Sequence, residues 1–301
     1  MTGRAPDHRP ARPAWAAAMA AATVVTATVT CMLAGCVTRS PAGHASPAAA
    51  RLPSGRAAWL LTRSALAQVV TDPGVRAGLG RSPVYEIVPP GQRPLPGVDA
   101  TPVITFPSVA ALGDALAGGR LPAGTRAVLY DPEAWSFTPP DEQRDPAGAA
   151  ARAAELAHAH GLKLIVAPAL NLTTVLAPGG PAPRWQRFLD LQLVARIAKV
   201  ADIVEVQAQS LERSPATYAA FAREAAGQAR SARPGVTVLA GLSTNPPGSV
   251  VGSQQLAAAI RASWPGVDGY WLNIPGPGPR CPNCNPARPD VGIEALRAVL
   301  S

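Results

Sequence analysis

From residue 84 onward, short β-branched and aliphatic runs alternate with segments that have the apolar period of an α-helix. The runs are bounded by Gly, Pro, Asn, Asp and Ser, which favour turns and loops. This alternation predicts strands at 84–88, 103–106, 127–131, 163–168, 203–209, 237–243 and 269–274. It predicts helices at 56–71, 108–118, 146–160, 185–200, 215–231, 253–263 and 291–300.

The links between these elements differ in length according to what they follow. Links after helices are short, whereas links after strands are long, at 132–145, 169–184, 244–252 and 275–290. In an α/β fold of the (β/α)8 type, the TIM barrel, the long links gather at the carboxyl-end face, where active sites are built. We therefore expect such a barrel with seven or eight strands, incomplete if the first unit lacks its strand. An open doubly wound parallel sheet is the alternative, although no G-x-G-x-x-G follows a strand.

The first 36 residues have the order of a secretory signal. Arg4, Arg9 and Arg12 precede an uncharged stretch from Ala14 to Leu33, and Leu33-Ala34-Gly35-Cys36 comes next. This tetrapeptide resembles the lipobox of bacterial lipoproteins. The resemblance implies cleavage before Cys36 and attachment of a lipid to its thiol. A plain transmembrane anchor is the alternative, because the stretch approaches the ~20 residues that span a bilayer.

The segment after Cys36 has almost no large apolar side chain, so it cannot bury enough surface to offset the entropy of ordering. We expect a signal peptide at 1–35, the lipidated cysteine with a flexible tether at 36–52, and a single TIM-barrel-like domain at 53–301. This organisation predicts a protein held by lipid on the extracytoplasmic face of the cell membrane.

The charge of the chain is high but dispersed. The formal net charge is +8, and the signal contributes +2 of it, three Arg against Asp7, which leaves about +6 on the mature chain. Nucleic-acid-binding proteins cluster their Lys and Arg on one face or segment, whereas these are scattered. No nucleic-acid partner is therefore expected.

Cysteine and histidine restrict the chemistry further. Cys281 and Cys284 are the pair left outside the signal and the lipobox, and outside the cytoplasm a disulfide between them is expected, with a redox or metal role as the alternative. His158 and His160 lie at a predicted helix end, so Ser-His-Asp catalysis lacks a base. The sequence indicates neither a cofactor nor a metal site.

Polar side chains fall in one phase of the predicted strands. Successive strand residues face opposite ways, so each run divides into a helix-facing and an axis-facing set. The axis-facing set and its extensions past the strand ends contain Asp131, Glu133, Asn171, Glu205, Gln207, Gln209, Ser243, Asn245, Trp271 and Asn273. Alternatively, Glu205 pairs with an arginine, the Gln residues satisfy the interior, and Asn171, Ser243 and Asn245 serve as turn residues.

The segment Tyr130-Asp131-Pro132-Glu133-Ala134-Trp135 has an Asp-x-Glu pair at a strand end. It resembles the pair of some barrel glycoside hydrolases, including the chitinase-like and lysozyme-like families. The resemblance implies that Glu133 is the general acid, that Asp131 orients substrate or tunes Glu133, and that Trp271 floors a sugar subsite. It departs from the chitinase pattern at Arg126 and Leu129, where that pattern has further acids.

Three functions are compatible with these features. The first is a lipid-anchored glycoside hydrolase acting on envelope or external polysaccharide, with catalytic residues Asp131, Glu133 and Glu205. The second is a non-catalytic lipoprotein that binds a carbohydrate or peptide. The third is an inactive structural barrel. In the first two, the substrate-binding residues are Trp135, Asn171, Gln207, Gln209, Asn245, Trp271 and Asn273.

Overall fold

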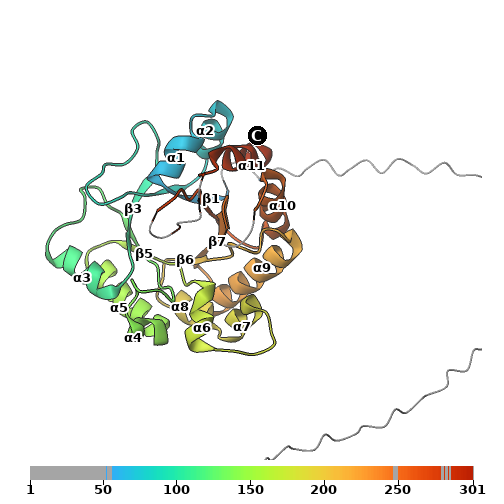
Figure 1. Cartoon of the computed structure of the whole chain (residues 1–301). Coiled ribbons are helices and arrows are strands. Elements are labelled where there is room, and N and C mark those ends of the chain that lie inside the picture. Colours follow the sequence, from blue (N-terminus) through green and yellow to red (C-terminus); the bar gives the residue numbers. More distant parts are fainter. Residues whose placement is uncertain are drawn as a thin grey trace, which may run out of the picture. The chain divides into compact units, whose positions relative to one another are not determined.

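In the computed structural model, eight parallel strands close into a barrel in which each strand pairs with the next in sequence and the last returns to the first (Figure 1). The structure describes residues 52, 56–246, 250–278, 281, 284 and 286–300. The lipobox and the predicted tether lie outside these residues, except for Leu52, which is buried and donates its backbone N–H to the carbonyl of Val299. The strands are β1 (Ala58–Thr62), β2 (Val84–Ile87), β3 (Thr101–Phe106), β4 (Ala127–Tyr130), β5 (Lys163–Val166), β6 (Ile203–Val206), β7 (Thr237–Ser243) and β8 (Gly269–Asn273).

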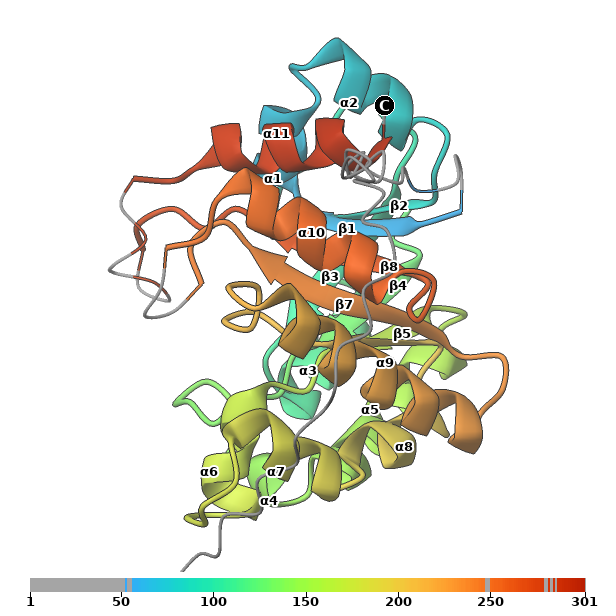
Figure 2. The same ribbon diagram turned by 90° about the vertical axis from the view of Figure 1, so that its right-hand side faces the viewer.

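Helices surround the barrel on its outer side (Figures 1 and 2). They are α1 (Arg63–Val69), α2 (Pro73–Leu79), α3 (Val109–Ala117), α4 (Pro140–Arg144), α5 (Pro146–Ala159), the 3-10 turn η1 (Leu170–Leu172), α6 (Thr173–Leu176), α7 (Arg184–Asp190), α8 (Leu193–Ala198), α9 (Pro215–Ala232), α10 (Ser253–Ser263) and α11 (Pro289–Leu300). The predicted (β/α)8 barrel is thus confirmed in its complete, eight-stranded form.

Local sequence signals explain several helix starts. The side chain of Asp145 accepts a hydrogen bond from the backbone N–H of Gly148 and precedes a first-turn proline, and Ser214 caps α9 in the same way. Such caps satisfy backbone donors that have no partner within the helix. Gly161 follows the end of α5 with a φ of 67°, a conformation that glycine adopts without steric cost.

The prediction of one helix over 56–71 is wrong in its first part. Ala58–Thr62 forms β1, and Thr62 then caps α1 through its side chain. Trp59, Leu60 and Leu61 are all fully buried, because this strand has the barrel interior on one face and helices on the other. A short strand that is apolar on both faces has no alternation to distinguish it from a helix.

The prediction of a continuous helix over 185–200 is also wrong. The chain forms α7 and α8 instead, and Gln192 between them takes a φ of 50°. A left-handed residue cannot continue a right-handed helix, so the two short helices take different directions.

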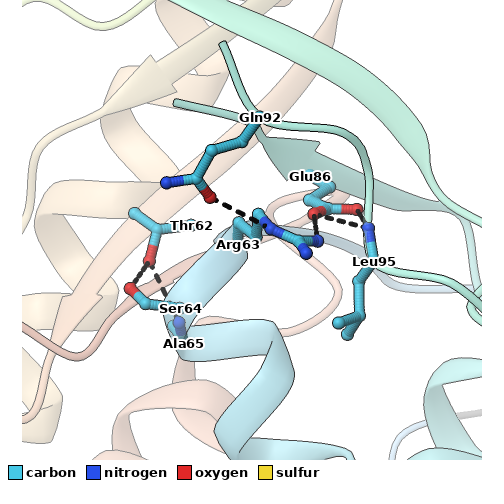
Figure 3. A network of polar contacts seen from close by, with 7 residues as sticks. All are labelled: Thr62, Arg63, Ser64, Ala65, Glu86, Gln92 and Leu95. Atoms are coloured by element: carbon cyan, nitrogen blue, oxygen red, sulfur yellow. Dashed lines mark hydrogen bonds and ion pairs between the residues drawn. The ribbon is translucent and has the colours of Figure 1, made fainter. Parts of the chain in front are cut away.

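The second barrel unit has no helix within the described residues, and segment 88–100 connects β2 directly to β3. The fully buried carboxylate of Glu86 holds this segment, because the backbone N–H of Leu95 lies 3.0 Å from each of its oxygens. Arg63 contacts both Glu86 and this segment. Its Nη1 lies 3.3 Å from Glu86 Oε1, and its Nε donates to Gln92 Oε1 at 3.1 Å (Figure 3). These contacts fix one side of the carboxyl-end face.

The core has two parts, one inside the barrel and one between barrel and helices. Leu129 and Trp271 belong to the interior cluster, whereas Tyr130, Val204 and Tyr270 pack against the helices. The strand phase predicted for β4, β6 and β8 is therefore confirmed. Polar residues in that phase that follow Leu129 along β4 and Ile203 along β6 lie toward the carboxyl-end mouth.

Candidate functional site

Asp131 follows β4 directly and is almost entirely buried, with 6% of its surface exposed. Gln207, which follows β6, donates from Nε2 to Asp131 Oδ1 at 2.7 Å and to the backbone carbonyl of Ala167 at 3.0 Å. A single amide thus joins the carboxyl ends of β4, β5 and β6. Two predicted site residues, Asp131 and Gln207, are in direct contact.

Glu133 lies two residues further on and is partly exposed. Asn171 Nδ2 donates to Glu133 Oε2 at 3.1 Å, and Asn171 Oδ1 accepts from the N–H of Ala134 at 2.9 Å. The Glu133 N–H donates to Thr138 Oγ1 at 3.2 Å. Asn171 therefore orients the Glu133 carboxyl, and its predicted contact with substrate remains a prediction.

Aromatic rings lie next to Glu133 in the same long link. Trp135 donates from its indole Nε1 to Thr138 Oγ1 at 2.8 Å, and its ring meets that of Phe137 edge-on at 5.1 Å. Phe137 is 49% exposed, which is unusual for a large apolar side chain. Apolar ring faces beside a carboxyl are suited to the apolar face of a sugar. Sequence reasoning missed Phe137, because a single aromatic residue in a loop has no periodic signal.

Glu205 on β6 is the third acid of the cluster and has no exposed surface. Within the part of the chain that the structure describes, neither carboxyl oxygen has a hydrogen-bond partner. Burial raises the pKa of Glu205 well above its ordinary value, and the charges of Asp131 and Glu133 raise it further. The three predicted catalytic acids thus lie within electrostatic range of one another, and the surroundings of Glu205 favour its protonated form.

Gly241 on β7 makes room for the carboxyl of Glu205. A Cβ at this position would lie 2.5 Å from Glu205 Oε1 and 2.6 Å from the amide of Gln209. Gln209 therefore lies over the same strand as Glu205, as its predicted phase requires. Trp271 is the β8 register partner of Gly241, is only 8% exposed, and has no hydrogen-bond partner for its indole nitrogen in the described structure. Its predicted role as a sugar floor remains a prediction.

Asn245 joins the last two loops, and a disulfide lies within the second of them. Asn245 Nδ2 donates to the carbonyls of Pro286 at 3.0 Å and Pro275 at 3.4 Å, and its backbone N–H donates to Ser243 Oγ. The predicted disulfide between Cys281 and Cys284 is confirmed, with 5.4 Å between the Cα atoms. Asn273 is partly exposed at the end of β8, where its carbonyl accepts from the N–H of Thr244.

Glu212 is a fully buried acid that sequence reasoning missed. It lies in the loop after β6, where no strand alternation indicates its direction. Its Oε1 accepts from the backbone N–H of Ser243 at 2.8 Å, and its Oε2 has no hydrogen-bond partner in the described part of the chain. Burial raises its pKa to about 7, against the lowering effect of backbone hydrogen bonds.

We predict that Glu212→Gln flattens the pH dependence of stability. An unfolded glutamate ionises near 4.5 and folded Glu212 near 7, so folding stability falls by about 3 kcal/mol as pH rises between these values. Glutamine still accepts from Ser243 and removes this loss. Urea titrations of both proteins from pH 4.5 to 8 test it. The exposed Asp114→Asn is the control, and identical curves for wild type and Glu212→Gln would contradict the assignment.

Within residues 56–246 and the other described positions, no group of three or more His, Cys, Asp or Glu side chains is placed to hold a metal ion. None of the helices there combines the length and the apolar character needed to cross a bilayer.

No family model and no curated protein matches the chain. Solved structures with a similar fold include a curdlan-specific exo-beta-1,3-glucanase from Blastomyces gilchristii, at 14% identity and a TM-score of 0.46 over 82% of this chain and 99% of that one. A chitinase from Chromobacterium violaceum has 13% identity and a TM-score of 0.43, over 81% of this chain and 98% of that one. Triosephosphate isomerase from Bartonella henselae has 13% identity and a TM-score of 0.42, over 72% of this chain and 92% of that one. What the chain shares with them is the barrel.

Proposed function

We propose that this protein is an exported, lipid-anchored glycoside hydrolase that acts on envelope or external polysaccharide, with Glu133 as the general acid. The observation that carries the proposal is the convergence of Asp131, Glu133 and Glu205 at the carboxyl ends of β4 and β6. Glycosidic bonds are cleaved by paired carboxyls, one of which must hold a proton at the working pH.

Accessibility and charge support the roles within this cluster. Glu133 is the one of the three with substantial exposure, so it is the acid that a substrate can reach. Asn171 fixes the Glu133 carboxyl in direction, as a proton donor requires. Glu205 is buried and its pKa is raised, which limits the negative charge of the cluster.

The proposal is tested first by activity. The purified chain is incubated with a panel of β-linked and α-linked polysaccharides, including cell-wall glycans, and new reducing ends are measured. We expect release from at least one of them, optimal where one acid of the cluster is protonated and another ionised. Absence of release across the whole panel would contradict the hydrolase assignment.

A binding function is the second candidate, and one observation favours it. Asp131 and Glu205 are almost wholly buried, which leaves no second carboxyl as accessible as Glu133. A binding protein would use Trp135 and the neighbouring amides for stacking and hydrogen bonding. Such a protein would show a rise in melting temperature with one glycan and no cleavage of it.

The anchor is tested separately through Cys36. We expect Cys36→Ala to leave the barrel folded and to move the protein from the membrane fraction to the soluble fraction, because a lipid chain supplies the membrane affinity. Cell fractionation with immunoblotting measures this, and Cys31→Ala is the matched control. A Cys36→Ala protein that still sediments with membranes would show that the uncharged segment anchors the chain instead.

A further inference from the structure

A pocket of about 360 Å³ lies on the outer wall of the barrel, between α7 and α9, away from the acid cluster. These two helices contact each other. Leu189 and Ala220 contribute apolar lining, and Trp185 lies at the pocket with part of its indole exposed. The pocket is independent of the function proposed above.

The break between α7 and α8 shapes this pocket. Gln192 takes a left-handed φ of 50°, which is strained for a residue other than glycine. Its side chain turns back to donate to the carbonyl of Leu189 at 3.2 Å. Such backbone outliers persist only where surrounding contacts hold them. The outlier at Gln192 ends α7 at the pocket.

Gln228 on α9 is a buried polar group at the pocket that is only partly satisfied. It is 8% exposed, and its Nε2 donates to the Leu189 carbonyl at 3.1 Å. Its Oε1 has no hydrogen-bond partner within the described residues. A buried acceptor left without a donor is destabilising, so a ligand that donates to Oε1 when the amide turns toward the pocket gains this interaction.

The remaining polar groups make the pocket a set of acceptors. Gln186 Nε2 donates to Asp190 Oδ1 at 3.3 Å, and the amides of Gln192 and Gln228 donate to Leu189. Each amide nitrogen of the lining therefore donates one of its two hydrogens within the protein. Asp190 and Glu224, by contrast, present exposed carboxylates. The site offers negative charge, an amide oxygen and an indole face, on a chain whose net charge is positive.

We propose that this pocket binds a small organic cation, a protonated primary amine carried on a compact apolar or sugar body. Its ammonium group supplies three donors, which match Gln228 Oε1 and the carboxylates of Asp190 and Glu224. The indole of Trp185 attracts a cation above its face and covers the apolar body. A neutral hydrogen-bond donor would lack the charge attraction of an ammonium group to the two carboxylates.

Calorimetric titration tests the proposal with matched charged and neutral probes. The probes are glucosamine and n-butylamine at a pH where the amine is protonated, and glucose and n-butanol as their neutral counterparts. We expect Kd values on the order of 1 mM for both amines and binding at least ~10-fold weaker for both neutral probes. Raised salt should weaken amine binding, because the carboxylates are exposed.

Variants connect the binding to the pocket. Asp190→Asn and Glu224→Gln each remove one exposed charge without touching the core, and each should weaken amine binding by ~3–10-fold. Asp114→Asn on α3 makes the same charge change elsewhere and should have no effect. Equal binding of glucose and glucosamine, no heat with either amine, or unchanged binding in the double variant of Asp190 and Glu224 would each overturn the proposal.

Discussion

Glu133→Gln is expected to lower the turnover of the best polysaccharide substrate by about 100-fold to 10,000-fold, the range that a positioned general acid contributes. The substitution removes the proton that the leaving oxygen needs. It keeps the shape of the side chain, and the amide oxygen still accepts from Asn171 Nδ2. Because Glu133 is partly exposed, the fold tolerates the change.

Reducing-end assays on purified wild type and Glu133→Gln measure this effect. Asp114→Asn, an exposed acid on α3, is the control for the change in charge and should keep wild-type turnover. The melting temperatures of all three proteins should agree closely. Equal turnover by wild type and Glu133→Gln would remove Glu133 from the mechanism, and with it the proposed reaction.

The largest expected effect on stability is that of Gly269→Ala, which should lower the free energy of unfolding by about 3 kcal/mol or more. Gly269 begins β8 and pairs with Ala58 of β1, where the barrel closes. A Cβ there would lie 2.0 Å from the backbone oxygen of Ala58 and 2.7 Å from its backbone nitrogen. Backbone atoms of a paired strand cannot move aside without breaking the closure.

Urea denaturation of Gly269→Ala measures the loss, and Gly227→Ala is its matched control. Gly227 lies within α9, and a Cβ there would meet nothing within 4 Å. That substitution should stabilise the protein by about 0.5–1 kcal/mol, since alanine favours helix. If Gly269→Ala is as stable as wild type, the closure between β1 and β8 is not as described.

The barrel could be predicted from the alternation of runs and the unequal links, because these follow from local chemistry. The strand at Trp59, Leu60 and Leu61 could not be predicted, because a short run buried on both faces shows neither the helical period nor the alternation of a half-buried strand. The break at Gln192 also has no local signal. Glutamine favours helix, and its left-handed conformation is set by contacts with Leu189.

The acid cluster shows the same division. The period of two in β4 and β6 is enough to predict that Asp131 and Glu205 lie on the axis-facing side. The hydrogen bond from Asn171 to Glu133 depends on how two loops pack against each other. The alternation within the strands carries no information about that packing. Glu212 and Phe137 were missed for the same reason, since both lie in long links where direction depends on tertiary packing.

The most direct test of the central claim is a crystal structure of Glu133→Gln with an oligosaccharide of the polysaccharide that wild type cleaves. We predict that the sugar lies against Trp135 and Phe137, with the scissile oxygen about 2.6–3.2 Å from the side chain at position 133. A sugar bound only elsewhere, such as between α7 and α9, would contradict a hydrolytic site at the carboxyl ends of β4 and β6.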